Sequence, residues 1–152
     1  MGDNNQGLYA SVFRHNRDAK GRLTVPSKWR FEGDEQQQYL AIPDPDGCIT
    51  VFPPRMQATM IERLQSLSLG NKAGKRAVTR LLSGSDTFEL DAAGRFKIKD
   101  ELYEHAGIGK NVALVGVLDR FQLWEPERYN QYLSAEEDEG DAMGETLASI
   151  GL

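Results

Sequence analysis

Apolar and polar residues alternate along several short stretches of the chain, and this period of two is typical of half-buried β-strands. It predicts strands over residues 8–13, 22–25, 39–42, 48–52, 87–90 and 95–98, and a hairpin over residues 111–124. Elsewhere apolar residues recur every three or four positions, which is the spacing of one helix face. This predicts helices after Pro54 and from Pro126, helices over residues 73–82 and 100–106, and a short helix over 27–31. In the helix over 73–82, the bases are expected to face solvent, and Ala77, Val78, Leu81 and Leu82 to face inward.

One part of this pattern occurs twice. Residues 18–29 read Asp-Ala-Lys-Gly-Arg-Leu-Thr-Val-Pro-Ser-Lys-Trp, and residues 91–102 read Asp-Ala-Ala-Gly-Arg-Phe-Lys-Ile-Lys-Asp-Glu-Leu. The copies are 73 residues apart, and the apolar stretch 49–54 recurs 72 residues later. Two copies are too few for a solenoid. They predict a pseudo-two-fold fold in which each half completes the other.

The repeated unit has the chemistry of a reverse turn. An aspartate such as Asp18 or Asp91 can accept hydrogen bonds from the backbone two residues on, and a glycine such as Gly21 or Gly94 adopts a positive φ at no steric cost. An arginine then begins the next strand. Two such turns, related by pseudo-symmetry, are expected to place two arginines on one face.

Composition limits the class of protein. The 152 residues suffice for one domain, or for two small halves that share a core. The single cysteine, Cys48, excludes an internal disulfide framework and a zinc-ligand cluster. No apolar run approaches the roughly 20 residues of a membrane span, and residues 1–7 lack a signal core. The sequence predicts a soluble cytoplasmic protein.

Charge is distributed unevenly. Residues 136–152 hold six acids and no base, so residues 1–135 carry a net charge of +1 against −5 for the whole chain. A single acid, Asp18, accompanies the six bases of residues 14–30, which are Arg14, Arg17, Lys20, Arg22, Lys28 and Arg30. Such a stretch is either an ordinary solvated face or a phosphate-binding one. The acidic tail is either a solvated end or a competitor of phosphate groups for this basic face.

With these motifs the chain resembles the MraZ family of bacterial transcription regulators, whose fold is similar to AbrB-type swapped-hairpin barrels. The resemblance covers about residues 7–133. It rests on both turn motifs, taken in order with the connecting stretches 46–49, 80–85, 105–108 and 112–116. Two positions depart from the family pattern, because Arg17 replaces an aliphatic residue and Lys99 replaces a proline.

The resemblance implies a DNA-binding regulator, usually a repressor, that assembles into rings. It recognises repeated boxes upstream of the cell-division and cell-wall gene cluster, and each Asp-x-x-x-Arg motif contacts DNA. The expected partners are therefore double-stranded DNA and further copies of the chain, at the nucleoid. The expected DNA-binding residues are Arg22, Arg95, Lys20, Arg14, Arg17 and Lys28, and the expected turn-organising residues are Asp18, Gly21, Asp91 and Gly94.

Two other functions stay open on the residues alone. The arginines could be structural partners of the aspartates in their own turns, and the basic face could bind an acidic protein, which would make the chain an interaction barrel. No histidine–nucleophile arrangement, metal-ligand spacing or carboxylate pair indicates an enzyme. No cofactor, metal ion, membrane or small-molecule substrate is expected.

The predicted fold is α+β: a pseudo-two-fold double-split, or swapped-hairpin, β-barrel built from two internal repeats, with flanking helices. The expected segments are a flexible N-terminal end at 1–6, a first repeat at 7–69, a connecting basic helix at 70–84, a second repeat at 85–135 and an acidic tail at 136–152.

Overall fold

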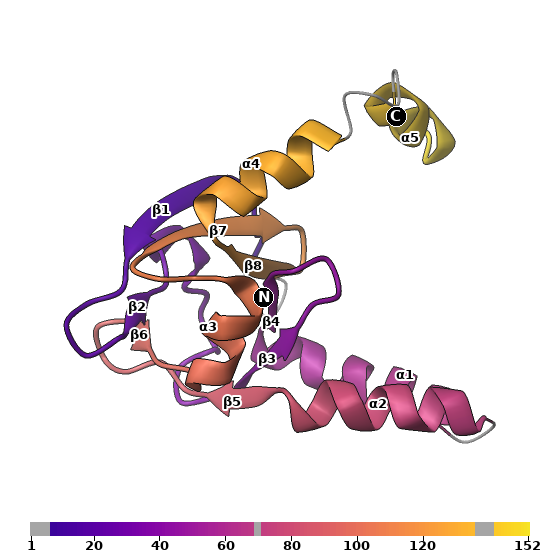
Figure 1. Ribbon diagram of the computed structural model, residues 1–152, viewed down its shortest axis with the longest axis horizontal. Helices are drawn as coiled ribbons and strands as arrows, with labels where there is room; N and C mark the ends of the chain where they lie inside the picture. Colours follow the sequence, from indigo (N-terminus) through magenta and orange to yellow (C-terminus); the bar gives the residue numbers. More distant parts are fainter. Residues whose placement is uncertain (1–6, 69–70, 136–141) are drawn as a thin grey trace.

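Six antiparallel strands form the main sheet, and two further strands form a separate ribbon (Figure 1). The computed structural model describes residues 7–68, 71–135 and 142–152. The strands are β1 (Val12–Asn16), β2 (Leu23–Thr24), β3 (Tyr39–Pro43), β4 (Ile49–Phe52), β5 (Asp86–Phe88), β6 (Arg95–Phe96), β7 (Asn111–Val117) and β8 (Arg120–Trp124). The helices are the 3-10 turns η2 (Ser27–Trp29) and η3 (Pro54–Met56), and α1 (Gln57–Ser68), α2 (Lys72–Ser83), α3 (Asp100–Ala106), α4 (Pro126–Ser134) and α5 (Ala142–Ser149). This mixture of helices and antiparallel sheet is the α+β class that the sequence predicts.

The main sheet is symmetric when equivalent strands of the two repeats are compared: β1 corresponds to β5, β3 to β7 and β4 to β8. The order is β1-β7-β8-β4-β3-β5. The leading strand of the first repeat, β1, pairs with β7 of the second, and the leading strand of the second repeat, β5, pairs with β3 of the first. The two repeats meet at the centre, where β4 pairs with β8. Each half therefore supplies an edge strand to the hairpin of the other half.

The sheet does not close into the predicted barrel. In the described part of the chain, its edge strands β1 and β5 each have only one paired neighbour, and β2 and β6 pair only with each other. This ribbon is two residue pairs long, so it cannot complete the hydrogen bonding between the two edges. It lies against the sheet instead: Leu23 and Phe96 are buried, and the Phe96 ring stacks on Phe88 of β5 with the ring centroids 4.4 Å apart.

The core lies between the inner face of the sheet, the ribbon and α3. Trp29 is at its centre, where the Tyr9, Phe13 and Phe121 rings pack around it with centroids 5.1 to 5.5 Å away. The α3 helix buries Leu102 and Ala106, four residues apart on one face, and ends at Gly107 with φ 67°. A smaller cluster, Cys48, Ala113 and Trp124, forms under α4 on the other face. Burial of these side chains is the main source of stability.

Some predicted boundaries were wrong for local reasons. The first strand was expected over 8–13, but it begins at Val12 because Ser11 has φ 77° and turns the chain; Tyr9 makes only an isolated bridge to Leu118. The strands predicted over 87–90 and 95–98 are the shorter β5 and β6. The short helix predicted over 27–31 ends at Trp29, since Arg30 is extended.

The helix predicted over 73–82 is α2, and its N-cap is the Asn71 side chain, which accepts hydrogen bonds from Ala73 N and Gly74 N. The expected inward face was wrong in part, because Ala77 and Leu82 are exposed. The reason is that α2 packs mainly against α1 and β3, and none of its described residues is buried.

The N-terminal end at 1–6 and the first six residues of the acidic tail, 136–141, lie outside the described residues. Farther along the tail, α5 forms a helix of its own. None of the described helices combines the length and the apolar character that a membrane crossing needs.

Candidate nucleic-acid interface

The first turn is organised by one carboxylate. Asp18 Oδ1 accepts hydrogen bonds from Lys20 N at 2.9 Å and from Arg22 N at 2.8 Å. The backbone closes the same loop, because Gly21 N donates to Asp18 O at 2.8 Å and Asp18 N donates to Arg22 O at 2.9 Å. Gly21 has φ 80°, a conformation that favours glycine. The sequence Asp-x-x-Gly-Arg thus fixes the backbone just before β2.

The second turn repeats this geometry. Asp91 Oδ1 accepts from Ala93 N at 3.0 Å and from Arg95 N at 2.8 Å, and Gly94 also has φ 80°. Gly94 N donates to Asp91 O at 2.9 Å, and Asp91 N donates to Arg95 O at 2.9 Å. The two Asp-x-x-Gly-Arg sequences therefore fold into turns with the same hydrogen bonds at two places in the chain.

Both turns hold their arginine side chain in the same way. Arg22 Nε donates to Asp18 Oδ2 at 2.8 Å, and Arg95 Nε donates to Asp91 Oδ2 at 2.8 Å. The arginine side chains are 28% and 38% exposed. Within the described residues, neither Nη1 nor Nη2 of either arginine donates a hydrogen bond. A surface ion pair contributes little to stability, so its main effect is to orient the guanidinium.

The aspartates are ionised more readily than usual. Hydrogen bonds from the backbone N–H of Arg22 and Arg95 are the main cause that lowers the pKa of Asp18 and Asp91, with further contributions from the arginine side chains. A lowered pKa in the folded protein means that the ionised carboxylate stabilises the turn above the ordinary aspartate pKa. That stabilisation is lost as the pH falls through the folded-state pKa.

We expect both carboxylates to titrate at a lower pH than the same residues in an unfolded peptide. Carbon-detected NMR of the Asp18 and Asp91 carboxyl groups measures this directly, with a peptide of residues 16–24 as the reference. The amide signals of Arg22 and Arg95 should move with the same midpoints, because those amides donate to the titrating oxygens. Midpoints equal to those of the peptide would contradict the geometry of the turns.

The other predicted DNA-binding residues are placed unequally. Lys20 is exposed at the tip of the first turn, where the second turn has Ala93. Arg14 is on an exposed position of β1, and Lys28 is exposed in η2. The first turn thus carries one more cation at its tip than the second.

Arg17 is held by the fold. Its guanidinium carbon lies 3.8 Å from the centroid of the Tyr103 ring, and its Nη1 donates to Gly109 O at 3.2 Å. Its Nε also donates to Gly21 O at 3.4 Å. Arg17, the residue that departs from the family pattern, therefore joins the first turn to α3 and to the loop after it.

Two basic residues near the turns were missed. Because β2 and β6 are antiparallel, the residues at the end of each strand lie beside the turn that starts the other. A Cβ atom added to Gly21 would lie 3.7 Å from Lys97 Cε, and one added to Gly94 would lie 2.4 Å from Arg30 Cζ. Arg30 Nε also donates to Val25 O at 2.9 Å. If the two repeated strands had been paired antiparallel, the positions of Lys97 and Arg30 beside the turns could have been predicted from the sequence.

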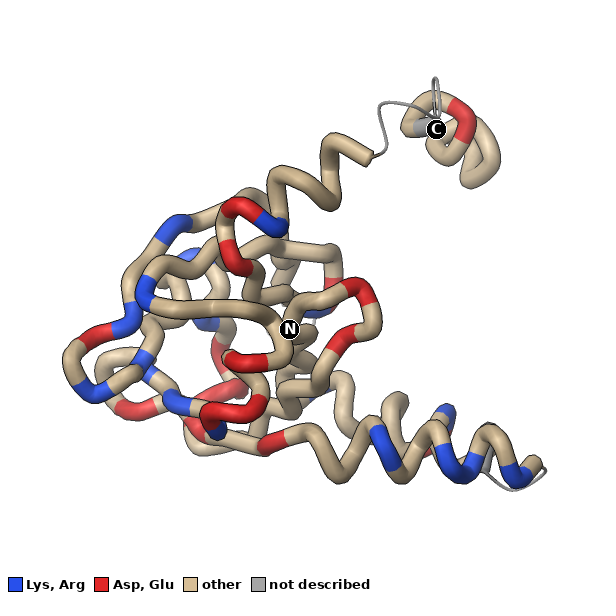
Figure 2. The backbone as a smooth tube through the Cα atoms, in the orientation of Figure 1, with Lys and Arg blue, Asp and Glu red and all other residues tan. Residues whose placement is uncertain are grey.

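The two turn loops project from the same end of the molecule (Figure 1), and lysines and arginines gather along them (Figure 2). The α1–α2 hairpin extends from the opposite end. The paired strands β2 and β6 hold the loops next to each other. This arrangement presents two similarly oriented arginines, with additional cations around them, on one surface.

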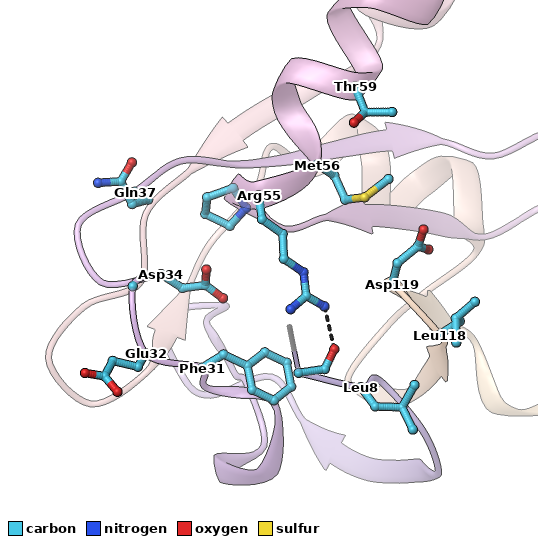
Figure 3. A pocket seen from close by; sticks show the side chains of 13 residues that line it. Leu8, Phe31, Glu32, Asp34, Gln37, Arg55, Met56, Thr59, Leu118 and Asp119 are labelled. Carbon is cyan, nitrogen blue, oxygen red and sulfur yellow. Dashed lines mark hydrogen bonds between the residues drawn. The ribbon is translucent and has the colours of Figure 1, made fainter. Parts of the chain in front are cut away.

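A hollow of about 710 Å³ lies elsewhere, among the N-terminal stretch, η3 and the loop before β3. Figure 3 shows the Arg55 side chain directed into it, with Asp34 and Asp119 on its walls. Arg55 Nη2 donates to Gly7 O at 2.7 Å, and its guanidinium faces the Phe31 ring. Burial raises the pKa of Asp34, and the opposing effect of Arg55 is smaller. No lining residue belongs to either turn, and no cluster of three or more metal-binding side chains occurs in the described chain.

Comparison with known proteins gives a consistent result. The family model described as "MraZ protein, putative antitoxin-like" matches residues 81–147, which include the second turn. A protein of Halothermothrix orenii named "Transcriptional regulator MraZ" is 30% identical over 146 residues, which cover 95% of this chain and 100% of that protein. Proteins of the same name are 32% identical in Finegoldia magna, over 95% of this chain and 100% of the relative, and in Lachnoclostridium phytofermentans, over 95% and 99%. These near-full-length matches confirm the resemblance, and the chain belongs to the MraZ family.

Proposed function

We propose that this protein is a sequence-specific DNA-binding transcription regulator that contacts DNA with Arg22 and Arg95. One observation carries the proposal: two copies of one turn hold two arginines by the same Nε–carboxylate contact, and a shared ribbon holds the copies together. The relatives, which are named as transcriptional regulators, support the same function.

The geometry suits recognition of a base edge. A guanidinium can donate two parallel hydrogen bonds to guanine O6 and N7, or to a phosphate. Asp18 and Asp91 engage the Nε atoms and leave the Nη atoms for such a contact. Their negative charge would repel phosphate, so the ion pair with arginine is what makes the turns compatible with DNA.

The surrounding cations supply affinity that does not depend on sequence. Lys20, Arg14 and Lys28 are exposed around the two arginines, and Lys97 and Arg30 flank the turns. Each phosphate contact releases condensed counterions, so the binding weakens steeply with salt. Arg17 contributes to DNA binding by holding the first turn in place, because its guanidinium packs on the Tyr103 ring and donates to Gly21 O.

Membership of the family supports finer assignments within the same proposal. The DNA sites are repeated boxes upstream of the cell-division and cell-wall gene cluster, and the effect there is repression. The protein acts at the nucleoid, in the cytoplasm, as a homo-oligomeric ring built on the swapped-hairpin plan. One subunit offers two contact turns, so a ring that binds several boxes gains affinity through effective concentration.

The proposal is tested by fluorescence anisotropy. The full chain is titrated into the duplex from upstream of its own gene and into a scrambled duplex, at two salt concentrations. We expect tight, salt-sensitive binding to the natural duplex. We also expect the Arg22→Ala/Arg95→Ala double variant to bind roughly a hundred-fold more weakly, since each bidentate contact to a base is worth about 1–3 kcal/mol.

Arg120→Ala is a matched control. Arg120 makes the same kind of surface pair, with Nε 2.8 Å from Asp119 Oδ1, but it lies on the β7–β8 hairpin. It should bind DNA like the parent protein. Arg22→Lys/Arg95→Lys separates base reading from charge, because lysine keeps the charge and loses the fork. Equal, weak binding of the parent protein to both duplexes would overturn the proposal and favour a basic face that binds an acidic protein.

A further inference from the structure

The α1–α2 hairpin carries apolar side chains that the described part of the chain leaves exposed. None of the described residues of the two helices is buried. Between them and the edge of the sheet lies a groove of about 340 Å³. It is lined by the apolar side chains of Leu40, Met60, Ile61, Leu64, Val78 and Leu82, together with the polar residues Gln38, Gln57, Gln65 and Thr87. Ile61 is 56% exposed and Leu82 is 42% exposed. Helices gain most of their stability from the packing of an apolar face, so an open groove between two helices indicates a binding surface.

The α2 helix, which lines one side of this groove with Val78 and Leu82, is basic. It carries Lys72, Lys75, Arg76 and Arg80 and no acid. Lys75 lies one turn before Val78, on the groove side of the helix. Figure 2 shows these bases at the end of the molecule opposite the turn loops. DNA would satisfy the charge and leave the apolar lining exposed, whereas an acidic amphipathic helix satisfies both.

This chain contains a segment with that chemistry. In and after α5, the apolar residues Met143, Leu147 and Ile150 are spaced by four and three positions, so they form one helix stripe, and all three are exposed. The residues that precede and begin this segment are acidic: Glu136, Glu137, Asp138, Glu139, Asp141 and Glu145. The same sequence thus contains an open apolar groove beside a basic helix, and an exposed apolar stripe with acids beside it.

We propose that the C-terminal segment, residues 136–152, of one copy of this chain docks in the α1–α2 groove of a second copy. The segment follows α4, which packs on β7, whereas the groove adjoins β3 and β5 at the other end of the strand order. In one copy, the segment therefore begins near β7, and the groove lies beside β3 and β5 farther along the strand order. A contact between them repeats from head to tail, and such a heterologous contact produces a closed ring when the rotation between copies closes.

The inference deepens the proposed self-assembly and does not depend on contact with DNA. The apolar stripe supplies the burial and the charges fix the direction of the segment in the groove. The assembly is accordingly expected to weaken when salt screens the lysines and the acids. Lys72→Glu/Lys75→Glu should weaken it as well.

Cross-linking between two full-length single-cysteine variants tests the proposal. Cys48 is buried, and burial raises the pKa of its thiol to about 12, so it does not compete in the reaction at neutral pH. A tagged Leu147→Cys protein is mixed with an Ile61→Cys protein of different size under mild oxidation, and the mixture is resolved on a non-reducing gel. Ser66→Cys replaces Ile61→Cys as the control, because Ser66 is exposed on α1 outside the groove.

We expect a disulfide-linked heterodimer with Ile61→Cys at a yield about ten-fold above that with Ser66→Cys, since docking raises the local thiol concentration. A yield equal to the Ser66→Cys control would overturn the proposal. A Leu147→Cys/Ile61→Cys chain that forms only an internal disulfide would overturn it too, since the segment would then dock on its own copy. The gel contains no DNA, so failure here is distinct from failure of the anisotropy test.

Discussion

Replacing Trp29 with alanine is expected to lower the free energy of unfolding by about 3–5 kcal/mol, the cost of removing a large buried aromatic side chain. Trp29 is 1% exposed and packs against three rings, two from the N-terminal stretch, Tyr9 and Phe13, and one from β8, Phe121. Its Nε1 also donates to Ala10 O at 3.1 Å, so the substitution leaves both a cavity and an unpaired carbonyl. Chemical denaturation followed by tyrosine and tryptophan fluorescence measures the loss.

Trp29→Phe should retain more of the stability than Trp29→Ala, because it keeps a ring in the cluster. Leu118→Ala, at a residue that is 68% exposed, should be close to neutral. Equal stability of Trp29→Ala and the parent protein would contradict the placement of Trp29 in the core. The result also bears on DNA binding, since Trp29 belongs to η2, which follows β2 and one of the two arginine turns.

Gly116→Ala is expected to destabilise the protein by about 1–3 kcal/mol through overpacking. The reason is a close approach of two backbones: a Cβ atom on Gly116 would lie 2.4 Å from Ala10 N and 2.6 Å from the Tyr9 carbonyl carbon. A side chain could rotate away from such a contact, but this backbone is held by hydrogen bonds between Tyr9 and Leu118 at 2.9 Å in both directions. Thermal unfolding of the variant measures the effect.

Gly109→Ala is the matched control, because no atom lies within 4 Å of a Cβ built there. It should unfold close to the parent temperature. If Gly116→Ala were as stable as Gly109→Ala, the crossing of the N-terminal stretch over β7 would have to be looser than the structure shows. A second readout is the amide of Gly116, which donates to Ser11 O at 2.9 Å and should exchange faster with solvent in the variant.

The features that were predictable from sequence are those that neighbouring residues determine. The two turns are largely local, since the hydrogen bonds that Asp18 and Asp91 accept join residues at most four positions apart. The α3 helix has the predicted bounds because its apolar spacing, the acids Asp100 and Glu101 in its first turn and Gly107 at its end all agree. The repeat predicted only that each half completes the other, and the exchange of hairpins was implied by the family resemblance.

The features that were missed depend on distant parts of the chain. The positions of Lys97 and Arg30 beside the turns follow from the pairing of β2 with β6, which joins residues about seventy positions apart. The contact of Arg17 with Tyr103 likewise needs α3 to be in place. The closed barrel was implied by the family resemblance. Hydrophobic alternation could not test it, because alternation indicates which residues are buried and gives no measure of how many residue pairs a ribbon can form.

The exchanged strand order has a consequence for synthesis of the protein in the cell. The ribosome synthesises the first repeat before the second, but β1 pairs with β7 of the second repeat. Val12 therefore cannot pair until Val115 has been synthesised. Until then the β3–β4 hairpin can form, but one side of β4 lacks its partner β8. Unpaired strand edges on a nascent chain attract other chains. The native sheet can therefore form only after nearly the whole chain has been translated, and the first repeat made alone is a candidate for capture by chaperones and not an independent domain.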